Sequence, residues 1–328
     1  MAERRGGKGS GKNAAKAAKH EAKASDKGAA GTREAAPAAR LAVRKTYKLY
    51  LGGAFPRSES GRSYPVTSAG GEHLANASLA SRKDARDAVS AARKAFGGWS
   101  SRTAYNRGQI LYRIAEVMEG RRDQFAAGLG RATGAGPDEA DRLVSAAIDR
   151  WVYYAGWTDK VAQVLGGANP VSGPYHNTST PEPTGVVAVL APQNAPLLGL
   201  TSVLAPVIAT GNTAVVVASE RAPLPAVDLA EVLATSDVPG GVVNVLTGRV
   251  PELGPHLASH ADVDALDLTG AGDAATEFEQ AAAETLTRVV RPGPDADAGE
   301  DAWLDPDPGT ARMTPFLETK TVWHPIGM

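Results

Sequence analysis

Polar and glycine residues that could bind a ligand follow short apolar segments in the second half of the chain. Each segment is rich in Val, Ala and Leu and has the length of a strand covered on both faces of a parallel sheet. The residues that follow these segments are Asn194, Ser219, Glu220, Gly248, Thr269 and Gly270. Ligands of open parallel sheets bind at the carboxyl ends of the strands. These six residues are therefore the candidate ligand site.

The chain contains no cysteine, which limits the chemistry that such a site can perform. Disulfides, thiolate metal sites and a cysteine nucleophile are all excluded. The amide of Asn194 could donate a hydrogen bond to a developing oxyanion, where one donor contributes about 3 kcal/mol, but it needs a nucleophile from elsewhere. A structural role, in which Asn194 turns and caps the strand end, explains this residue equally well. We assign no nucleophile and no metal ligand.

Strands and helices that alternate along the chain would bring these residues together. Residues 186–190 and 213–217 are predicted buried strands, and residues 197–209 between them are a predicted helix. Helix and strand then alternate twice more, in residues 223–234, 240–248, 252–260 and 263–268. This order predicts an α/β fold, a doubly wound, Rossmann-like parallel sheet with flanking helices.

Three helices are predicted before this region, after extended segments in residues 47–66. The first begins after Ser81, a predicted N-cap, and ends at a Gly-Gly pair. The second has an apolar face around Leu111, and the third extends from Asp138 to about Val164. Aromatic residues of the third helix could form a binding site, but their helical spacing favours a core or interface role. These residues are Trp151, Tyr153, Tyr154 and Trp157.

The first 45 residues differ in composition from the rest. Of the 35 Lys and Arg residues, 12 lie in this segment, whereas only 4 of the 36 Asp and Glu residues do. Large apolar residues are almost absent before Leu41, so we expect a disordered tail. It lacks aromatic residues for base stacking, which favours a solubilising role over nucleic-acid binding. Its Gly-Lys-Gly-Ser-Gly-Lys segment follows no strand and is not a phosphate loop.

The length of 328 residues allows two domains or one large domain with tails. No apolar run of about 18 residues suggests a membrane span, and the basic N-terminus is not followed by the apolar core of a signal peptide. We therefore expect no membrane association and a cytoplasmic location. Near the other end, residues 272–290 are predicted to be one helical stretch and residues 291–311 a loop rich in Pro and Asp.

The order of motifs around the first two strands resembles the nicotinamide-binding half of the aldehyde dehydrogenase superfamily. The matching segments are Pro192-Gln193-Asn194-Ala195-Pro196, Leu204-Ala205-Pro206, Gly211-Asn212-Thr213 and Ser219-Glu220. The match covers about residues 48–271 and a last segment from Met313. The resemblance implies oxidation of aldehydes with NAD or NADP, and it places Asn194 at the amide that binds the oxyanion.

Four departures from the family affect catalysis and cofactor binding. The family uses a cysteine nucleophile and a glutamate base in a catalytic domain, for which residues 272–311 leave no room. In the family a Lys and a Glu hold the adenosine ribose; Glu220 matches the Glu, but Val217 occupies the Lys position. Gln193 replaces a Trp, and Ala271 replaces a Ser. We therefore expect NAD or NADP to bind weakly or not at all at the six candidate residues.

The resemblance also implies two oligomerisation elements, a β-arm at about residues 166–184 and a final strand. We expect the final strand to follow a flexible linker and to find a partner strand only on another subunit. His176 in the arm is expected to be a surface residue rather than a metal ligand. The expected organisation is a basic tail (1–45), a dinucleotide-binding domain (46–277), a helix with an acidic linker (278–312) and the final strand (313–328).

Three functions are compatible with these features. The favoured one is a non-catalytic family member that forms a homo-oligomer, or a hetero-oligomer with a full-length aldehyde dehydrogenase. The first alternative is an active oxidoreductase that contributes Asn194 to a shared site. The second is a degenerate protein with residual dinucleotide binding.

Overall fold

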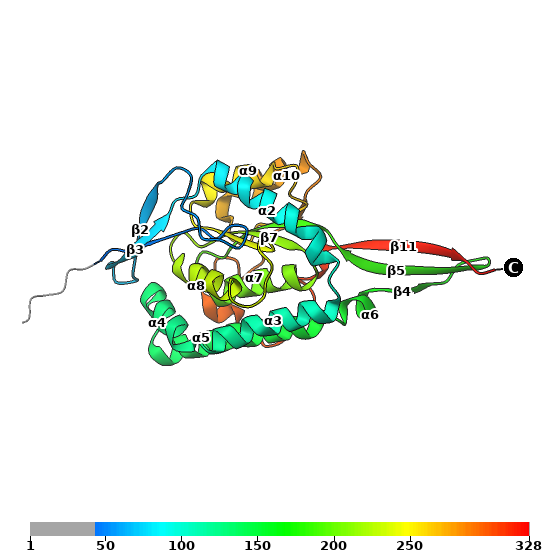
Figure 1. The fold of residues 1–328 in the computed structure, drawn as a ribbon, viewed down its shortest axis with the longest axis horizontal. Helices are drawn as coiled ribbons and strands as arrows, with labels where there is room; N and C mark the ends of the chain where they lie inside the picture. The colour runs from blue at the N-terminus through cyan, green and yellow to red at the C-terminus, as the bar shows by residue number, and fades with distance from the viewer. Residues whose placement is uncertain (1–42, 328) are drawn as a thin grey trace, which may run out of the picture. The chain divides into compact units, whose positions relative to one another are not determined.

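The computed structural model describes residues 43–327, and a five-stranded parallel sheet lies at the centre of this part (Figure 1). Its strand order is β10-β9-β6-β7-β8, and every neighbouring pair is parallel. The strands are β6 (Val186–Leu190), β7 (Thr213–Val217), β8 (Val243–Leu246), β9 (Ala265–Asp267) and β10 (Arg288–Val290). The predicted α/β fold with a doubly wound parallel sheet is confirmed.

Helices cover both faces of the sheet, because alternate strand residues point to opposite faces. Val187 and Val189 belong to one hydrophobic core, and Val186 and Leu190 to the other. The helices on the first face are α3 (Ala104–Glu119), α5 (Pro137–Trp157), α7 (Leu198–Ala209) and α8 (Leu224–Leu233). Those on the second face are α2 (Arg82–Ser100), α9 (Val250–Ala258) and α10 (Ala275–Ala283) (Figure 1).

The helices before the sheet follow the prediction with three differences. The predicted stop of the first helix at Gly97-Gly98 is wrong, because α2 continues through both glycines to Ser100, and the buried Trp99 of this last turn packs in the core. Ser81 caps α2, as predicted, and Trp151 and Tyr154 are fully buried in the core. However, the predicted third helix is two helices, since α5 is followed by α6 (Val161–Leu165) after a turn. The helix α4 (Arg122–Thr133) was not predicted.

The prediction of one helical stretch over residues 272–290 is wrong. A short 3-10 turn, η1 (Gly272–Ala274), leads into α10, which ends at Ala283, and the chain then forms the edge strand β10. The helix ends because Leu286 adopts a left-handed conformation (φ 56°) and the N–H of Thr287 donates to the carbonyl of Ala282. Because glycine is the residue that usually marks such a helix end in a sequence, a leucine at this position did not indicate it.

The predicted flexible linker is also wrong, because residues 291–312 pack against the body. The 3-10 turn η2 (Glu300–Trp303) places Glu300 and Trp303 in buried sites. Arg150 of α5 donates to the carbonyl oxygens of Trp303 and Asp305, each at 2.7 Å. A second 3-10 turn, η3 (Thr314–Phe316), then leads into the final strand.

The final strand pairs within its own chain, contrary to our expectation. The arm is a three-stranded sheet of order β11-β5-β4, built from β4 (Gly167–Asn169), β5 (Tyr175–Pro183) and β11 (Leu317–Pro325) (Figure 1). β11 is antiparallel to β5 over its whole length. The arm itself supplies the partner strand that we expected from another subunit.

A second small sheet, of order β1-β3-β2, lies near the start of the described part. Its strands are β1 (Thr46–Tyr47), β2 (Ser63–Thr67) and β3 (His73–Ser78). No helix of residues 43–327 is long and apolar enough to cross a bilayer. The predicted disordered tail lies, except for its last three residues, outside the described residues.

Candidate dinucleotide site

A cavity of 660 Å³ opens at the carboxyl ends of the central strands. Of the six candidate residues, Asn194, Glu220 and Gly270 line it, from the ends of β6, β7 and β9. Ser219, Gly248 and Thr269 lie behind this surface as buried residues. The predicted residues therefore come together, but only three of them reach the cavity.

The side chain of Asn194 is already bonded on both sides. Its Nδ2 donates to the carbonyl oxygen of Asp297 at 2.7 Å, and its Oδ1 accepts from Arg221 at 2.8 Å. Asp297 belongs to the segment after β10, so residues far along the chain close this end of β6. The amide is available to another ligand only if these bonds are released.

Ser219 and Gln193 join the ends of β6 and β7. The hydroxyl of Ser219 donates to the carbonyl of Gln193 at 2.8 Å, and the side-chain oxygen of Gln193 accepts from the N–H of Glu220 at 2.9 Å. Ser219 is nearly inaccessible to solvent. Its role in this arrangement is to hold the two strand ends in register, so that Glu220 faces the cavity.

Glu220 forms an ion pair that the sequence did not indicate. Its carboxylate lies 3.3 Å from Nε of Arg249, which follows β8 and also lines the cavity. Val217 is fully buried within β7 and cannot reach a ligand. The cation next to Glu220 therefore comes from a neighbouring loop, and only the adjacency of Arg249 to Gly248 could have suggested it.

The glycines and Thr269 shape the backbone at the far side of the cavity. A Cβ on Gly270 would overlap the carbonyl oxygen of Ala191. Only glycine therefore fits where the chain that leaves β9 passes close to the chain that leaves β6. The hydroxyl of Thr269 donates to Asp267 at 2.5 Å. A Cβ on Gly248 would lie 3.2 Å from Leu253. These three residues act through packing and backbone shape.

Two titratable groups around the site have raised pKa values that sequence reasoning missed. The hydroxyl of Tyr64, which lines the cavity, is buried without a hydrogen-bond partner within residues 43–327. Burial raises its pKa, and the negative charge of Glu220 adds to this effect. Burial also raises the pKa of Asp267, although Arg312 lies 3.9 Å away and opposes the shift.

Glu300 lies next to the site, at the start of α7. Its two carboxylate oxygens accept the backbone N–H groups of Leu197, Leu198 and Gly199 at 2.8, 2.9 and 3.1 Å. Burial raises the pKa of Glu300 to about 7, although the three N–H donors act in the opposite direction. It binds no ligand in this arrangement, because its oxygens are fully used by α7.

Comparison with known proteins identifies the family. The model of the aldehyde dehydrogenase family matches residues 55–291. DhaS of Bacillus subtilis is 35% identical over 252 residues, which are 76% of this chain and 50% of that protein. Retinal dehydrogenase 2 of Mus musculus is 33% identical over 262 residues, 77% of this chain and 49% of that protein.

The chain belongs to the aldehyde dehydrogenase family. Solved structures of the family share its fold. A point mutant of betaine aldehyde dehydrogenase from Staphylococcus aureus, in complex with NAD+, has a TM-score of 0.71 and 27% identity, and the match covers 74% of this chain and 49% of that one. An aldehyde dehydrogenase of Bacillus cereus, also in complex with NAD+, has a TM-score of 0.69 and 30% identity, covering 75% and 50%.

The chain spans about half the length of the curated relatives it matches. The matches to the family model and to these relatives confirm the family membership that the motifs around Asn194 predicted. No group of three or more His, Asp and Glu residues that could hold a metal ion occurs within residues 43–327.

Proposed function

We propose that this chain is a non-catalytic member of the aldehyde dehydrogenase family that assembles through its arm. The partner is a second copy of the chain or a full-length aldehyde dehydrogenase. One observation carries the proposal: the chain keeps a long arm sheet whose outer strand is β11, while it contains no cysteine to attack an aldehyde. The cytoplasm is the proposed location, supported by similarity to cytosolic aldehyde dehydrogenase 1 of Elephantulus edwardii.

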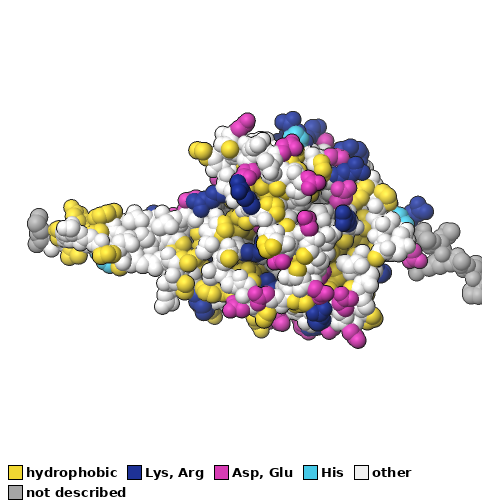
Figure 2. Space-filling model, turned by 180° about the vertical axis from the view of Figure 1, so that it is seen from behind, with side chains coloured by type: hydrophobic (Ala, Val, Ile, Leu, Met, Phe, Trp, Pro, Cys, Tyr) yellow, Lys and Arg dark blue, Asp and Glu magenta, His cyan; other side chains and the backbone are white. Residues whose placement is uncertain are grey.

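The outer strand of the arm has the features of an association edge. One side of β11 pairs with β5, so the other side presents backbone N–H and C=O groups that no other strand of residues 43–327 pairs. Tyr175, Trp323 and Ile326 expose 43%, 56% and 56% of their surface near its end. Figure 2 shows hydrophobic side chains gathered toward the outer end of the arm. An edge of this length, with exposed apolar residues, favours pairing with another chain.

The strand-end cavity fits a dinucleotide in part. Glu220 and the unpartnered hydroxyl of Tyr64 are the residues that would hold ribose hydroxyls, and Arg249 would keep Glu220 in place. NAD or NADP would supply a hydride acceptor there. Because Val217 is buried and the carboxylate of Glu220 is already paired, we propose that the affinity is weak.

The contacts of Asn194 support the proposal that the chain alone does not oxidise aldehydes. Asn194 is bonded to Asp297 and Arg221, and one oxyanion donor has no effect on rate without a nucleophile. Purified protein should form no NADH above a blank without protein, for aliphatic and aromatic aldehydes. NADH formation that Asn194→Ala abolishes would contradict this part of the proposal.

Light scattering on a truncated chain tests assembly. A chain that ends at Lys320 loses Trp323 and Ile326 but keeps Phe316 in the core and the ion pair of Glu318 with Arg288. The natural chain should be an oligomer, or should co-purify with a full-length aldehyde dehydrogenase, and the truncated chain should be monomeric.

Point variants separate assembly from loss of folding. Trp323→Ser should weaken association, whereas Tyr112→Ser, which changes a similarly exposed aromatic residue on α3, should leave it unchanged. A natural chain that is monomeric when purified and recovers no family member from its own cells would overturn the proposal.

A further inference from the structure

A second cavity lies between the first turns of α2 and the end of α9, and no residue lines both this cavity and the one at the strand ends. Its volume is 560 Å³, within the range of small-molecule sites. Arg82, Lys83 and Arg86 of α2 line one side, and His256 and His260 line the other. No Asp or Glu is among its lining residues.

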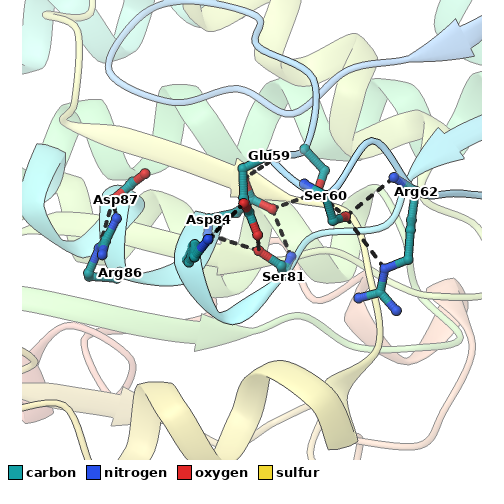
Figure 3. A network of polar contacts seen from close by, with 9 residues as sticks. Glu59, Ser60, Arg62, Ser81, Asp84, Arg86 and Asp87 are labelled. Atoms are coloured by element: carbon teal, nitrogen blue, oxygen red, sulfur yellow. Dashed lines mark hydrogen bonds and ion pairs between the residues drawn. The ribbon is translucent and has the colours of Figure 1, made fainter.

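The positive charges of this cavity are only partly balanced. Lys83 pairs with Glu59 at 3.2 Å. Arg86 pairs with the neighbouring Asp87 at 2.7 Å (Figure 3). Arg82, in contrast, has no carboxylate within 4.0 Å among residues 43–327. Figure 2 shows Lys, Arg and His side chains together at the upper edge of the molecule, the side on which Figure 1 places α2 and α9.

The two histidines line the same side of the cavity. Burial lowers the pKa of His256, and the positive charge of Arg82 adds to this effect. The N–H of Asp262 donates to Nδ1 of His260 at 3.1 Å. In its neutral form His260 therefore carries its ring proton on Nε2, which makes that atom a hydrogen-bond donor.

We propose that the cavity between α2 and α9 binds a small organic phosphate. Arg82 and the ring nitrogens of His256 and His260 would contact the dianionic group, since guanidinium and imidazole donors together match several phosphate oxygens. Ala85 and Ala261 in the lining leave space for an apolar body. A nucleic acid fits less well, because the lining contains no aromatic side chain for base stacking.

Calorimetric titration with phenyl phosphate and with inorganic phosphate, at constant ionic strength, tests this site in the full chain. We expect saturable binding of one equivalent, with phenyl phosphate the tighter ligand. Arg82→Gln should weaken binding about tenfold or more, because a charge-assisted contact is lost. The matched substitution Arg131→Gln on α4, and Glu220→Gln in the other cavity, should leave it unchanged.

A second variant and a local probe guard against loss of folding. His256→Gln should also weaken binding, and its circular dichroism spectrum should match that of the natural chain. In proton NMR, phosphate should raise the pKa of His256, since a nearby dianion favours the imidazolium. Absence of saturable binding, or equal losses in Arg82→Gln and Arg131→Gln, would overturn the proposal.

Discussion

The helices α2 and α7 begin in different ways, although each follows a strand of the same body. The start of α2 is closed by its own first turn: the hydroxyl of Ser81 accepts the N–H of Asp84 at 3.4 Å, and Asp84 accepts the N–H of Ser81 at 2.7 Å (Figure 3). The start of α7 has no such closure, because its N-cap is Leu197. Glu300, 103 residues later in the chain, accepts its N–H groups instead.

The difference follows from burial. Ser81 is half-buried, so water can assist its cap, whereas all twelve residues of α7 are buried. Unpaired N–H groups at a buried helix start are costly, and a distant acidic side chain is the means by which this chain satisfies them. The start of α7 thus depends on the segment that contains Glu300, which is synthesised about a hundred residues after the helix itself.

The largest effect should come from removing the distant cap. Glu300→Ala should lower the free energy of unfolding by about 3 to 5 kcal/mol, because it leaves three buried N–H groups without an acceptor. Urea unfolding monitored by circular dichroism measures this change. The adjacent Asp301→Ala removes only an exposed ion pair with Arg142 and should cost under about 1 kcal/mol. Equal losses in the two variants would contradict the importance of the buried cap.

The same contrast shows what could be predicted from the sequence. An N-cap serine before a helical pattern is a local signal, and the β-branched strands around Val187 and Val215 are equally local, so Ser81 and these strands were predicted correctly. The contribution of Asp84 to the cap was not predicted. The contacts of Glu300 and Arg249 join segments far apart in the chain, and no spacing rule reports them. The end of α10 at Ala283 was missed because Leu286, the residue after it that adopts φ 56°, is not a glycine.

The candidate site was predicted to a similar extent. Asn194, Glu220 and Gly270 were correctly placed at strand ends, since topology alone determines where parallel strands end. Their hydrogen-bond partners could not be predicted, because Asp297 and Arg249 lie in loops whose path depends on packing. The pairing of β11 with β5 was missed for the same reason.

A smaller effect of the distant cap should appear in the pH dependence of stability. Burial raises the pKa of Glu300 to about 7, above its usual value, so the folded state binds a proton that the unfolded state releases. The free energy of unfolding should therefore fall as pH rises from about 4.5 to about 7, by about 2 kcal/mol, and change little above this range. Asp228, whose pKa burial raises to about 6, contributes in the same direction.

Comparison with Glu300→Gln isolates this contribution. The variant keeps the shape of the side chain but cannot titrate, so the difference between the two stability profiles reports Glu300 alone. We expect a shallower decrease in the variant between pH 4.5 and 7 than in the natural chain. Parallel profiles in this window would show that Glu300 keeps an ordinary pKa and that its N–H donors outweigh burial.

The smallest effect should come from the local cap. Ser81→Ala removes the hydroxyl that accepts the N–H of Asp84 and donates to Glu59 at 3.0 Å, but Asp84 still accepts the N–H of residue 81. The free energy of unfolding should fall by about 1 kcal/mol, the usual value for an N-cap. Ser100→Ala, at the other end of α2, should change it by less than about 0.5 kcal/mol. The two variants Ser81→Ala and Glu300→Ala could instead lower the free energy of unfolding by the same amount. One half-buried N–H group without its acceptor would then cost as much as three buried ones, and burial would not explain the difference between the two helix starts.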